Sequence, residues 1–301
     1  FRFDMKKLKI GYFADGPWSH EALKRLLLDD TLQIAFVCAR ADTPDLILKV
    51  KAAENGLDFI THPKINSDEF LGWMTKYDCD LFVSMSFNQI FRSALINLPA
   101  LKTINCHAGK LPFYRGRNIL NWALINDEDE FGITVHYVDE GIDTGDIILQ
   151  RCYPITDEDN YATLLELAYK ECATNLYDAI KEVQSNNVKV IVQQNINQLG
   201  FYCTARKDGD ERLNWNQKSR DIFNFVRAIC RPGPEARTYL RDMEIKINKL
   251  QYLPDAANYK GIIGSVVGVE SNAFFVKTLD SFVKVTEWSG CTRPRIGDRL
   301  K

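Results

Sequence analysis

Asn105 and His107 stand two residues apart in the stretch INCHAG, where a strand-like apolar run breaks into a loop. Side chains alternate between the two faces of a strand, so these two project in the same direction. An asparagine amide donates hydrogen bonds, and a histidine exchanges a proton near neutral pH. Gly109 then lets the backbone turn and leaves space above the imidazole. The pair suits chemistry at a carbonyl carbon, with an oxyanion donor beside a base.

A third candidate group lies in the turn DEGIDTGD at 139–146, which places four acidic side chains between two expected strands. One of these carboxylates is expected to orient the imidazole and to stabilise its charged form. Together, an amide donor, an imidazole and a carboxylate suit the attack of an amine on an acyl carbonyl. The spacing leaves a second interpretation open, in which Asn105 forms a turn and His107 is a surface histidine. It also does not place Asp143 beside His107, 36 residues away.

The elements that would position these residues alternate between strand and helix. Apolar runs predict buried strands, and apolar residues at helical spacing predict the helices between them. This alternation predicts an α/β fold, with a Rossmann-like, mostly parallel sheet and helices on both faces. Ligands bind such sheets at the carboxyl ends of the strands, where Ser86 and His107 fall. The predicted strands are 8–14, 32–39, 57–62, 79–86 and 101–107, and the predicted helices are 20–28, 42–56 and 67–77.

The turn after the first strand reads ADGPWSHE and contains no GxGxxG motif. A dinucleotide cofactor is therefore not expected, although this turn still faces the ligand edge of the sheet. Trp18 within the turn is interpreted either as a packing residue or as a contact to a substrate.

The second half predicts a return hairpin, a long helix and then a separate domain. Strands are expected at 132–138 and 147–155, and an amphipathic helix at 159–185. After one more helix at 219–230, short strands follow with glycine-rich turns. We therefore expect a catalytic domain at 5–203, a linker and crossover helix at 204–230, and a small OB-like β-barrel at 231–301.

Charge and composition narrow the class of protein. The formal net charge is −2, from 38 basic and 40 acidic residues, so a surface that holds a polyanion is not expected. No apolar run reaches the ~18–20 residues of a membrane helix, and the start of the chain is polar. The eight cysteines are scattered without a CxxC pair, which favours free thiols in a reducing cytoplasm over disulfides or a metal site. FRFD, ahead of Met5, is interpreted as a remnant of recombinant expression.

Two separated segments carry a resemblance to a known family. NCHAGKLPFYRGRNILNWALIN, followed by GITVHYVDEGIDTGDIILQ, resembles the 10-formyltetrahydrofolate-dependent formyltransferases. That family includes enzymes acting on glycinamide ribonucleotide, methionyl-tRNA and nucleotide sugars. The resemblance covers roughly residues 6–200, and ARKDGDERLNW resembles the start of the C-terminal barrel in the last two groups. The family's N-x-H and downstream D-x-G motifs fall on Asn105, His107 and Asp143.

This resemblance implies N10-formyltetrahydrofolate as the co-substrate and no metal. It assigns Asn105 to the oxyanion, His107 to the proton transfers, and Asp143 to holding His107. The folate is expected to contact the loop MSFNQIF and the turn that carries Asp143. The residues expected to bind it are Ser86, Phe87, Gln89, Ile90, Phe91, Asp139 and Gly141.

The stretch AGKLPFYRGRNILNWAL is more similar to the sugar N-formyltransferases than to the tRNA enzymes. The acidic net charge favours the same choice. So does our interpretation that the C-terminal strands lack a Lys-Arg cluster. We therefore expect a dTDP- or UDP-linked amino sugar as acceptor, in O-antigen or lipopolysaccharide biosynthesis, with methionyl-tRNA formylation as the alternative. No nucleic acid or membrane partner is expected, and a homodimer stays open. The residues expected to bind the acceptor are Trp18, Gly109, Lys110, Tyr114, Arg115, Arg117, Asn118 and Trp215.

Overall fold

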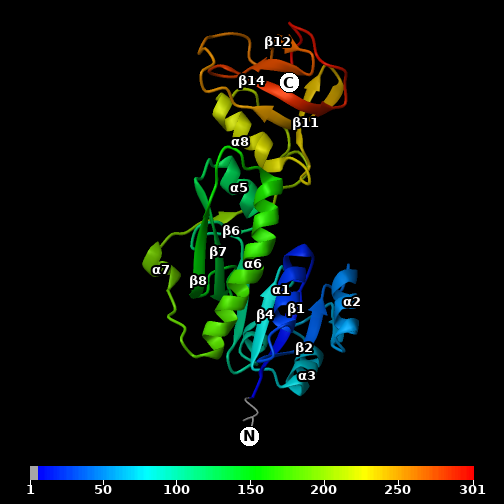
Figure 1. Ribbon diagram of the computed structural model, residues 1–301, viewed down its shortest axis with the longest axis vertical. Helices are drawn as coiled ribbons and strands as arrows, with labels where there is room; N and C mark the ends of the chain where they lie inside the picture. The colour runs from blue at the N-terminus through cyan, green and yellow to red at the C-terminus, as the bar shows by residue number, and fades with distance from the viewer. Residues whose placement is uncertain (1–5) are drawn as a thin grey trace. The chain divides into compact units, whose positions relative to one another are not determined.

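The computed structural model describes residues 6–301, so the interpretation of FRFD concerns residues outside it. The chain divides into two compact units, which Figure 1 shows coloured by residue number. Within residues 6–301, no helix is both long and apolar enough to cross a membrane. Of the described residues, unit 1 comprises 6–116, Gly132–Tyr153 and Glu166–Tyr202, and unit 2 comprises Arg117–Phe131, Pro154–Leu165 and Cys203–Lys301.

Unit 1 is built on a seven-stranded sheet in the order β3-β2-β1-β4-β5-β7-β8. The first five strands in that order pair in parallel, whereas β7 runs antiparallel to β5. This mixed sheet confirms the predicted Rossmann-like, mostly parallel architecture. Its strands are β1 (Leu8–Ala14), β2 (Leu32–Ala39), β3 (Asp58–Thr61), β4 (Leu81–Met85), β5 (Thr103–His107), β7 (Glu130–Tyr137) and β8 (Ile147–Pro154). The short strands β6 (Arg115–Gly116) and β9 (Tyr202–Cys203) pair separately.

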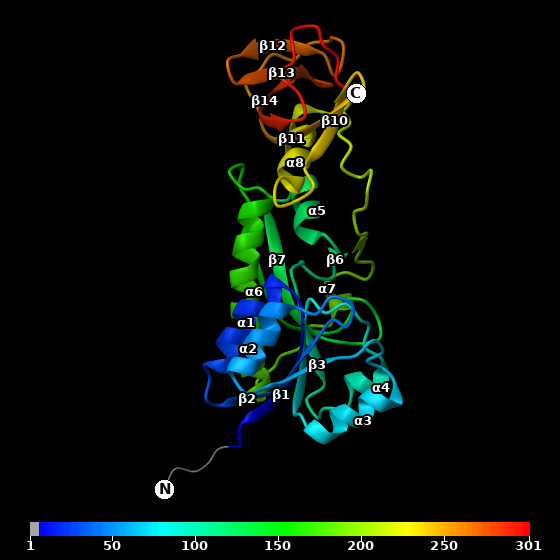
Figure 2. The same ribbon diagram turned by 90° about the vertical axis from the view of Figure 1, so that its right-hand side faces the viewer.

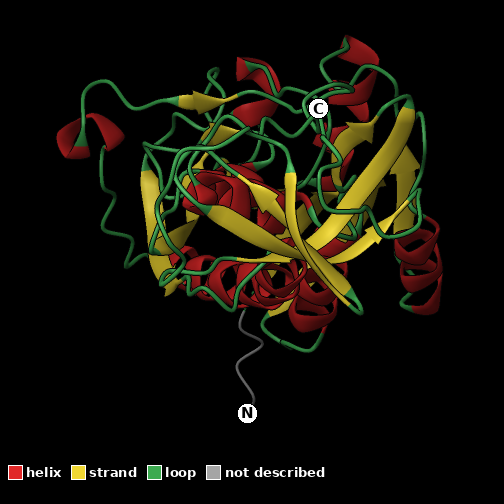
Figure 3. Ribbon diagram, turned by 90° about the horizontal axis from the view of Figure 1, so that it is seen from above, coloured by secondary structure: helices red, strands yellow, loops and turns green. Residues whose placement is uncertain are grey.

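Helices cover both faces of this sheet. Figure 2 shows α1, α2 and α6 on one side, and α3 and α4 on the other. In Figure 3 the short helix α7 lies at the margin on a long loop. The helices wholly or mostly in unit 1 are α1 (Pro17–Leu27), α2 (Leu46–Glu54), α3 (Asp68–Tyr77), α4 (Ser93–Ile96), α6 (Tyr161–Gln184) and α7 (Gln193–Ile196).

Local sequence signals set where the first helices begin. Asp45 and Ser67 cap α2 and α3, because their side chains accept hydrogen bonds from the backbone N–H groups of Leu48 and Phe70. Pro17 opens α1, at a position where a missing backbone N–H is tolerated. The sequence therefore determines these turns locally, at the edge of the sheet where the site lies.

An aromatic cluster fills the space between the sheet and helices α3 and α4. Phe13 of β1 is fully buried at its centre. The rings of five other phenylalanines lie between 5.0 and 6.2 Å from the Phe13 ring, all in edge-to-face arrangements. Such pairs add about 0.5–1.5 kcal/mol each beyond the burial of area. The cluster therefore anchors the ends of β1 and β4, from which the loop at 86–91 departs.

Phe13→Ala is expected to lower the free energy of unfolding by about 3–5 kcal/mol, because it removes a buried ring from a packed cluster. Chemical denaturation followed by circular dichroism measures this change. The control is Leu28→Ala, because Leu28 is 77% exposed and its truncation should change stability by less than about 0.5 kcal/mol. Equal losses in the two variants would contradict this description of the core.

Unit 2 contains a separate antiparallel sheet of five strands in the order β10-β11-β14-β13-β12. The end of the chain closes this sheet, since Leu300 pairs with Leu240 of β10 and Arg299 pairs with Ser265, just before β12. The predicted C-terminal β domain is therefore present, and closure of the two edges makes it barrel-like. The elements of unit 2 are α5 (Ile119–Ile125), α8 (Ser219–Ile229), β10 (Ala236–Leu240), β11 (Met243–Gln251), β12 (Val266–Glu270), β13 (Ala273–Lys277) and β14 (Phe282–Ser289).

Trp215 lies in the interior of unit 2, which corrects the prediction that it stacks on a nucleotide base. The residue is 4% exposed, and its indole N–H donates to Thr238 Oγ1 at 2.9 Å. Leu213 and Trp215 are buried while Asn214 and Asn216 are exposed, so the chain is extended here with one face inward. A buried tryptophan with its N–H satisfied serves packing.

Candidate active site

Strand β5 places Asn105 and His107 on one face of the sheet. In the strand register, Asn105 stands opposite His136 of β7. Cys106 points to the other face, where its thiol lies 3.7 Å from the backbone oxygen of Cys172 in α6. The pleat of the strand therefore separates two polar side chains on one face from a buried thiol on the other.

His107 is buried, and both of its ring nitrogens face oxygen atoms. Nε2 lies 2.7 Å from the Tyr114 carbonyl oxygen, and Nδ1 lies 3.6 Å from Oδ2 of Asp143. A carbonyl oxygen only accepts, so Nε2 carries a proton and the lone pair of the neutral ring is on Nδ1. The side of the ring that takes up a proton therefore faces the carboxylate.

Asp143 is a largely buried carboxylate, with a side chain 13% exposed, and is held from three directions. Besides facing His107, its Oδ1 lies 3.5 Å from Nε2 of His136, and its Oδ2 accepts from the Gly116 backbone N–H at 3.0 Å. Burial alone would raise the pKa of this carboxyl, but the two imidazoles in their protonated forms and the Gly116 hydrogen bond hold the pKa well below its usual range. The group is therefore charged at neutral pH and can stabilise an imidazolium.

His136 completes the cluster, and the sequence analysis did not single it out. The residue is 2% exposed, and its Nδ1–H donates to the Tyr137 carbonyl at 2.8 Å. In the neutral ring Nε2 accepts from the Asn105 Nδ2 amide at 3.3 Å, and in the protonated ring the same atom faces Asp143 Oδ1 as a donor. This bond orients the Asn105 amide and leaves its second hydrogen for a ligand. The available signal was the histidine in GITVHYV, but only the strand register shows that it faces Asn105.

The turn between β7 and β8 depends on two glycines. A Cβ at Gly141 would lie 2.0 Å from Thr144 Oγ1, and one at Gly145 would lie 1.8 Å from a backbone carbonyl oxygen of β7. The Gly141 N–H and the Thr144 hydroxyl both donate to Asp139 Oδ1. Asp143 has a φ of 55°, a left-handed conformation that a non-glycine residue keeps only where its surroundings hold it. The turn is thus closed internally and directs the Asp143 carboxylate inward.

Gly109, in the loop after β5, lies close to the His107 ring. A Cβ there would lie 2.5 Å from His107 Nε2 and 2.5 Å from the Tyr114 carbonyl oxygen. The Gly109 carbonyl accepts from Thr134 Oγ1 at 2.7 Å, and Gln150 Nε2 donates to the same hydroxyl at 2.8 Å. Glycine at this position therefore leaves room for the hydrogen bond between His107 and Tyr114.

Three residues predicted to bind a pterin are accessible in the loop after β4. Ser86 is exposed with a φ of 60°, Ile90 is 53% exposed, and Phe87 is half-buried. In the turn, Asp139 and Gly141 are exposed. These five residues are available to a ligand.

Phe91 is buried, which corrects its prediction as a ligand contact, whereas Gln89 is half-buried with its side chain hydrogen-bonded within the protein. Phe91 is 4% exposed, and its ring lies 5.0 Å from that of Phe13 in the aromatic core. The Gln89 side chain donates to the His62 carbonyl at 2.8 Å and accepts from the Ile65 N–H at 3.2 Å. The sequence pattern of this loop does not distinguish an apolar residue that lines a ligand from one that anchors the loop.

The predicted acceptor-binding residues of unit 1 differ in exposure and in the contacts that they make within the protein. Trp18 is half-buried, edge-on to Tyr169 with ring centroids 4.8 Å apart. Lys110 is half-buried, and Tyr114 is 7% exposed. The Arg115 guanidinium donates through Nε and Nη2 to one oxygen, Gln193 Oε1, at 3.2 and 2.8 Å. Arg115 therefore has a protein partner already.

In unit 2, Arg117 and Asn118 are both exposed. Asn118 opens helix α5, and its Oδ1 accepts from the Arg206 backbone N–H at 2.8 Å. The Arg117 backbone N–H donates to the Cys203 carbonyl at 3.1 Å. This leaves the charged side chain of Arg117 in solvent.

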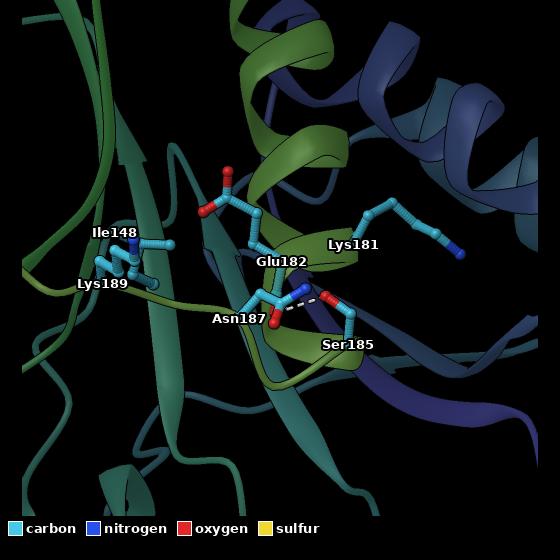
Figure 4. Close-up of a pocket in the computed structure, with 6 residues that line it drawn as sticks. All are labelled: Ile148, Lys181, Glu182, Ser185, Asn187 and Lys189. Carbon is cyan, nitrogen blue, oxygen red and sulfur yellow. Dashed lines mark hydrogen bonds between the residues drawn. The ribbon is translucent and has the colours of Figure 1, made fainter.

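Figure 4 shows a separate surface pocket of unit 1, lined by Ile148, Lys181, Glu182, Ser185, Asn187 and Lys189. Lys181 points away from the others and donates to Asp29 Oδ2 at 3.0 Å. None of the six belongs to the cluster around Asp143. Across residues 6–301, no three His, Cys, Asp or Glu side chains are grouped to hold a metal ion.

The fold and the cluster together define a class of enzyme. An amide donor, an imidazole and a charged carboxylate meet at the ligand edge of a Rossmann-like sheet, as group transfer to or from a carbonyl requires. Residues 9–180 match the family described as formyl transferase, and residues 206–293 match its C-terminal domain. The chain therefore belongs to the formyl transferase family of folate-dependent one-carbon transferases.

Relatives of similar sequence are named methionyl-tRNA formyltransferase. The one from Pelotomaculum thermopropionicum is 33% identical over 267 residues, covering 87% of this chain and 82% of that protein. The one from Azobacteroides pseudotrichonymphae is 32% identical over 265 residues, covering 84% and 81%.

Solved structures of similar fold include sugar N-formyltransferases. WlaRD, a sugar 3N-formyl transferase solved in the presence of dTDP and 5-N-formyl-THF, has a TM-score of 0.69 at 23% identity, covering 95% of this chain and 99% of that chain. The N-formyltransferase from Helicobacter canadensis, in complex with folinic acid and dTDP-3-aminofucose, has a TM-score of 0.66 at 21% identity, covering 94% and 100%. At these identities the likeness establishes the fold.

Gly109→Ala is expected to lower kcat by about 10²-fold, because the added methyl group must displace His107 or the Tyr114 carbonyl. Steady-state kinetics of formyl transfer measures the loss, and thermal unfolding checks the fold. Gly72→Ala is the matched control, since a Cβ there meets no atom within 4 Å and alanine favours helix α3. If Gly109→Ala were as active as this control, the close fit above His107 would not matter for activity.

Proposed function

We propose that this protein transfers the formyl group of N10-formyltetrahydrofolate to the amine of a dTDP- or UDP-linked amino sugar, for surface polysaccharide such as O-antigen. The observation that carries formyl transfer is the charged Asp143 carboxylate buried beside His107, with Asn105 on the same strand face. The segment KLPFYRGRN, with its arginines and tyrosine, supports a nucleotide-sugar acceptor.

In the proposed reaction the acceptor amine attacks the formyl carbon, and the carbonyl oxygen takes up negative charge. The Asn105 amide hydrogen that His136 leaves free donates to this oxygen. His107 takes the amine proton at Nδ1, so that the imidazolium lies between the Tyr114 carbonyl and the Asp143 carboxylate. The proton then passes to N10 as the bond between the formyl carbon and N10 breaks.

The loop at 86–91 is the proposed site for the pterin of the co-substrate, which supplies an activated formyl group. The exposed side chain of Ile90 and the half-buried ring of Phe87 offer an apolar wall for a flat ring. Ser86 follows β4 directly, and β4 pairs in parallel with the strand that carries His107. Asp139 and Gly141 are proposed to meet the polar edge of the pterin.

Arg117 is the proposed contact to the pyrophosphate of the acceptor. Its side chain is exposed, and a guanidinium binds phosphate oxygens in pairs. Arg115 keeps three of its five N–H donors, two on Nη1 and one on Nη2, because Gln193 accepts from Nε and from Nη2 once each. Lys110, Tyr114 and Trp18 are proposed to contact the sugar.

Methionyl-tRNA formylation is the second candidate, and two observations favour it. The relatives at 32 and 33% identity carry that name. In addition, residues 204–301 contain 18 Lys and Arg against 12 Asp and Glu, so the C-terminal part is positively charged, as a polyanion binder requires. Arg237 stands opposite Lys246 in the β10–β11 pair, and its backbone forms an isolated β-bridge with Arg212. This corrects the expectation that the C-terminal strands lack a basic cluster.

His107→Ala and Asn105→Ala are each expected to lower kcat/KM by about 10²–10⁴-fold, since one removes the base and the other an oxyanion donor. Asp143→Asn should lower kcat and move the acid limb of the pH–rate profile to lower pH, because the imidazolium loses its counter-charge. The wild-type carboxylate stays charged across this limb, because its pKa lies well below its usual range. Near-normal turnover in any of these purified, folded variants would remove that residue from the mechanism.

With N10-formyltetrahydrofolate, the purified protein should formylate a dTDP- or UDP-linked amino sugar and leave charged initiator tRNA unmodified, as mass spectrometry of both products would show. Arg117→Ala should raise KM for the nucleotide sugar by about 10-fold or more without a comparable change for folate. Arg212→Ala is the control for the other candidate, since it should affect only a tRNA acceptor. Efficient formylation of the tRNA would reverse the choice of acceptor.

A further inference from the structure

Gln193 is a buried residue in a segment whose neighbours are exposed. It is 2% exposed, whereas Val192 is 39% and Ile196 is 46% exposed. The segment lies between the two matched family regions, of which the first ends at residue 180 and the second begins at residue 206. A polar side chain turned inward from such a segment needs hydrogen-bond partners.

The Gln193 amide uses its full hydrogen-bonding capacity. Nε2 donates to the backbone carbonyls of Asp143 and Gly145 at 2.9 and 2.7 Å. Oε1 accepts from Nε and Nη2 of Arg115 at 3.2 and 2.8 Å. Since an amide has two donor hydrogens and two acceptor lone pairs, every position is filled. One side chain therefore ties the turn of Asp143 to the loop of Arg115.

The two segments that Gln193 joins are those that face the His107 ring. The Tyr114 carbonyl, next to Arg115, accepts from His107 Nε2, and the Asp143 carboxylate faces His107 Nδ1. Tyr114 and Asp143 have φ values of 54° and 55°, left-handed conformations that need support from their surroundings. Gln193 supplies that support directly at the Asp143 carbonyl.

The segment that carries Gln193 also contacts the loop before Gly116, through Phe201. Phe201 packs on Tyr114 with ring centroids 4.8 Å apart. Its backbone N–H donates to the Pro112 carbonyl at 3.3 Å, and its carbonyl accepts from the Arg115 N–H at 3.1 Å. Figures 1 and 3 both show α7, which begins at Gln193, at the margin of the unit. Gln193 thus reaches inward from the surface to the support of the site.

We propose that Gln193 is a positioning residue for formyl transfer, which holds the Asp143 turn and the Arg115 loop at the separation that His107 requires. The inference rests on the proposed roles of Asp143 and His107, and it holds for either class of acceptor. Gln193 acts through Asp143. An amide is required, because glutamate would set a carboxylate against two carbonyl oxygens and leucine would offer no donor at all.

Gln193→Leu and Gln193→Glu are each expected to lower kcat by about 10²-fold, with KM for N10-formyltetrahydrofolate changed far less, since misplacing a catalytic group by about 1 Å has such an effect. The assay uses whichever acceptor, a nucleotide amino sugar or charged tRNA, the wild-type protein formylates. Gln194→Leu is the matched control, because Gln194 is the exposed neighbour and should keep wild-type kinetics. Thermal unfolding identifies any variant that fails to fold, and the second substitution then carries the test.

A double variant separates positioning from a general structural role. If Gln193 acts through Asp143, then Gln193→Leu combined with Asp143→Asn should be no slower than Asp143→Asn alone. Gln193→Leu should also move the acid limb of the pH–rate profile in the same direction as Asp143→Asn, because a displaced Asp143 carboxylate stabilises the imidazolium less. Two outcomes would overturn this inference alone. In the first, the losses in kcat from Gln193→Leu and Asp143→Asn multiply in the double variant. In the second, both Gln193 variants keep wild-type kcat although Asp143→Asn is disabled. A fully active Asp143→Asn would overturn the proposed mechanism and this inference together.

Discussion

Asp143 holds a carboxylate in a largely buried position, and such a group stays charged only where donors and positive charge surround it. The surrounding elements meet that condition from separate parts of the chain. β5 supplies His107, β7 supplies His136, and the loop after β5 supplies the Gly116 N–H. Removing any of these would leave a buried charge with fewer partners, so the arrangement of the strands and loops is tied to this one group. The chemistry follows, because the same charge stabilises a protonated His107.

The antiparallel pairing of β5 and β7 explains how distant residues form one site. It sets His136 opposite Asn105, so the Asn105 amide is oriented by a side chain of the neighbouring strand. The turn after β7 then folds back over this face and brings Asp143 to His107. That turn is not held by its own hydrogen bonds alone, since the backbone carbonyls of Asp143 and Gly145 are bound by Gln193 from outside. The site therefore depends on a residue that lies away from the reacting groups.

The two candidate acceptors share one reaction and differ in what must be recognised beyond the amine. A nucleotide sugar needs a few well-placed phosphate contacts, whereas a tRNA needs an extended positive surface. The charge of this chain is divided between its parts, with 20 basic and 28 acidic residues in 1–203 and the excess of basic residues in 204–301. The net charge of the whole chain hides this division, because the two parts nearly cancel. The choice between the two acceptors therefore depends on where the basic residues lie in the chain, and not on the net charge of the whole chain.

The sequence by itself determined the alternating strands and helices, the caps at Asp45 and Ser67, the shared face of Asn105 and His107, and the family, because these depend on local periodicity and on motifs. Tertiary structure decided the rest. Phe91 and Trp215 are buried because of packing that no local pattern specifies. His136 meets Asn105 across 31 residues, and Gln193 meets Asp143 and Arg115 across 50 and 78 residues. Contacts at such separations follow from strand register and loop closure, so the support of the site became visible only in the folded chain.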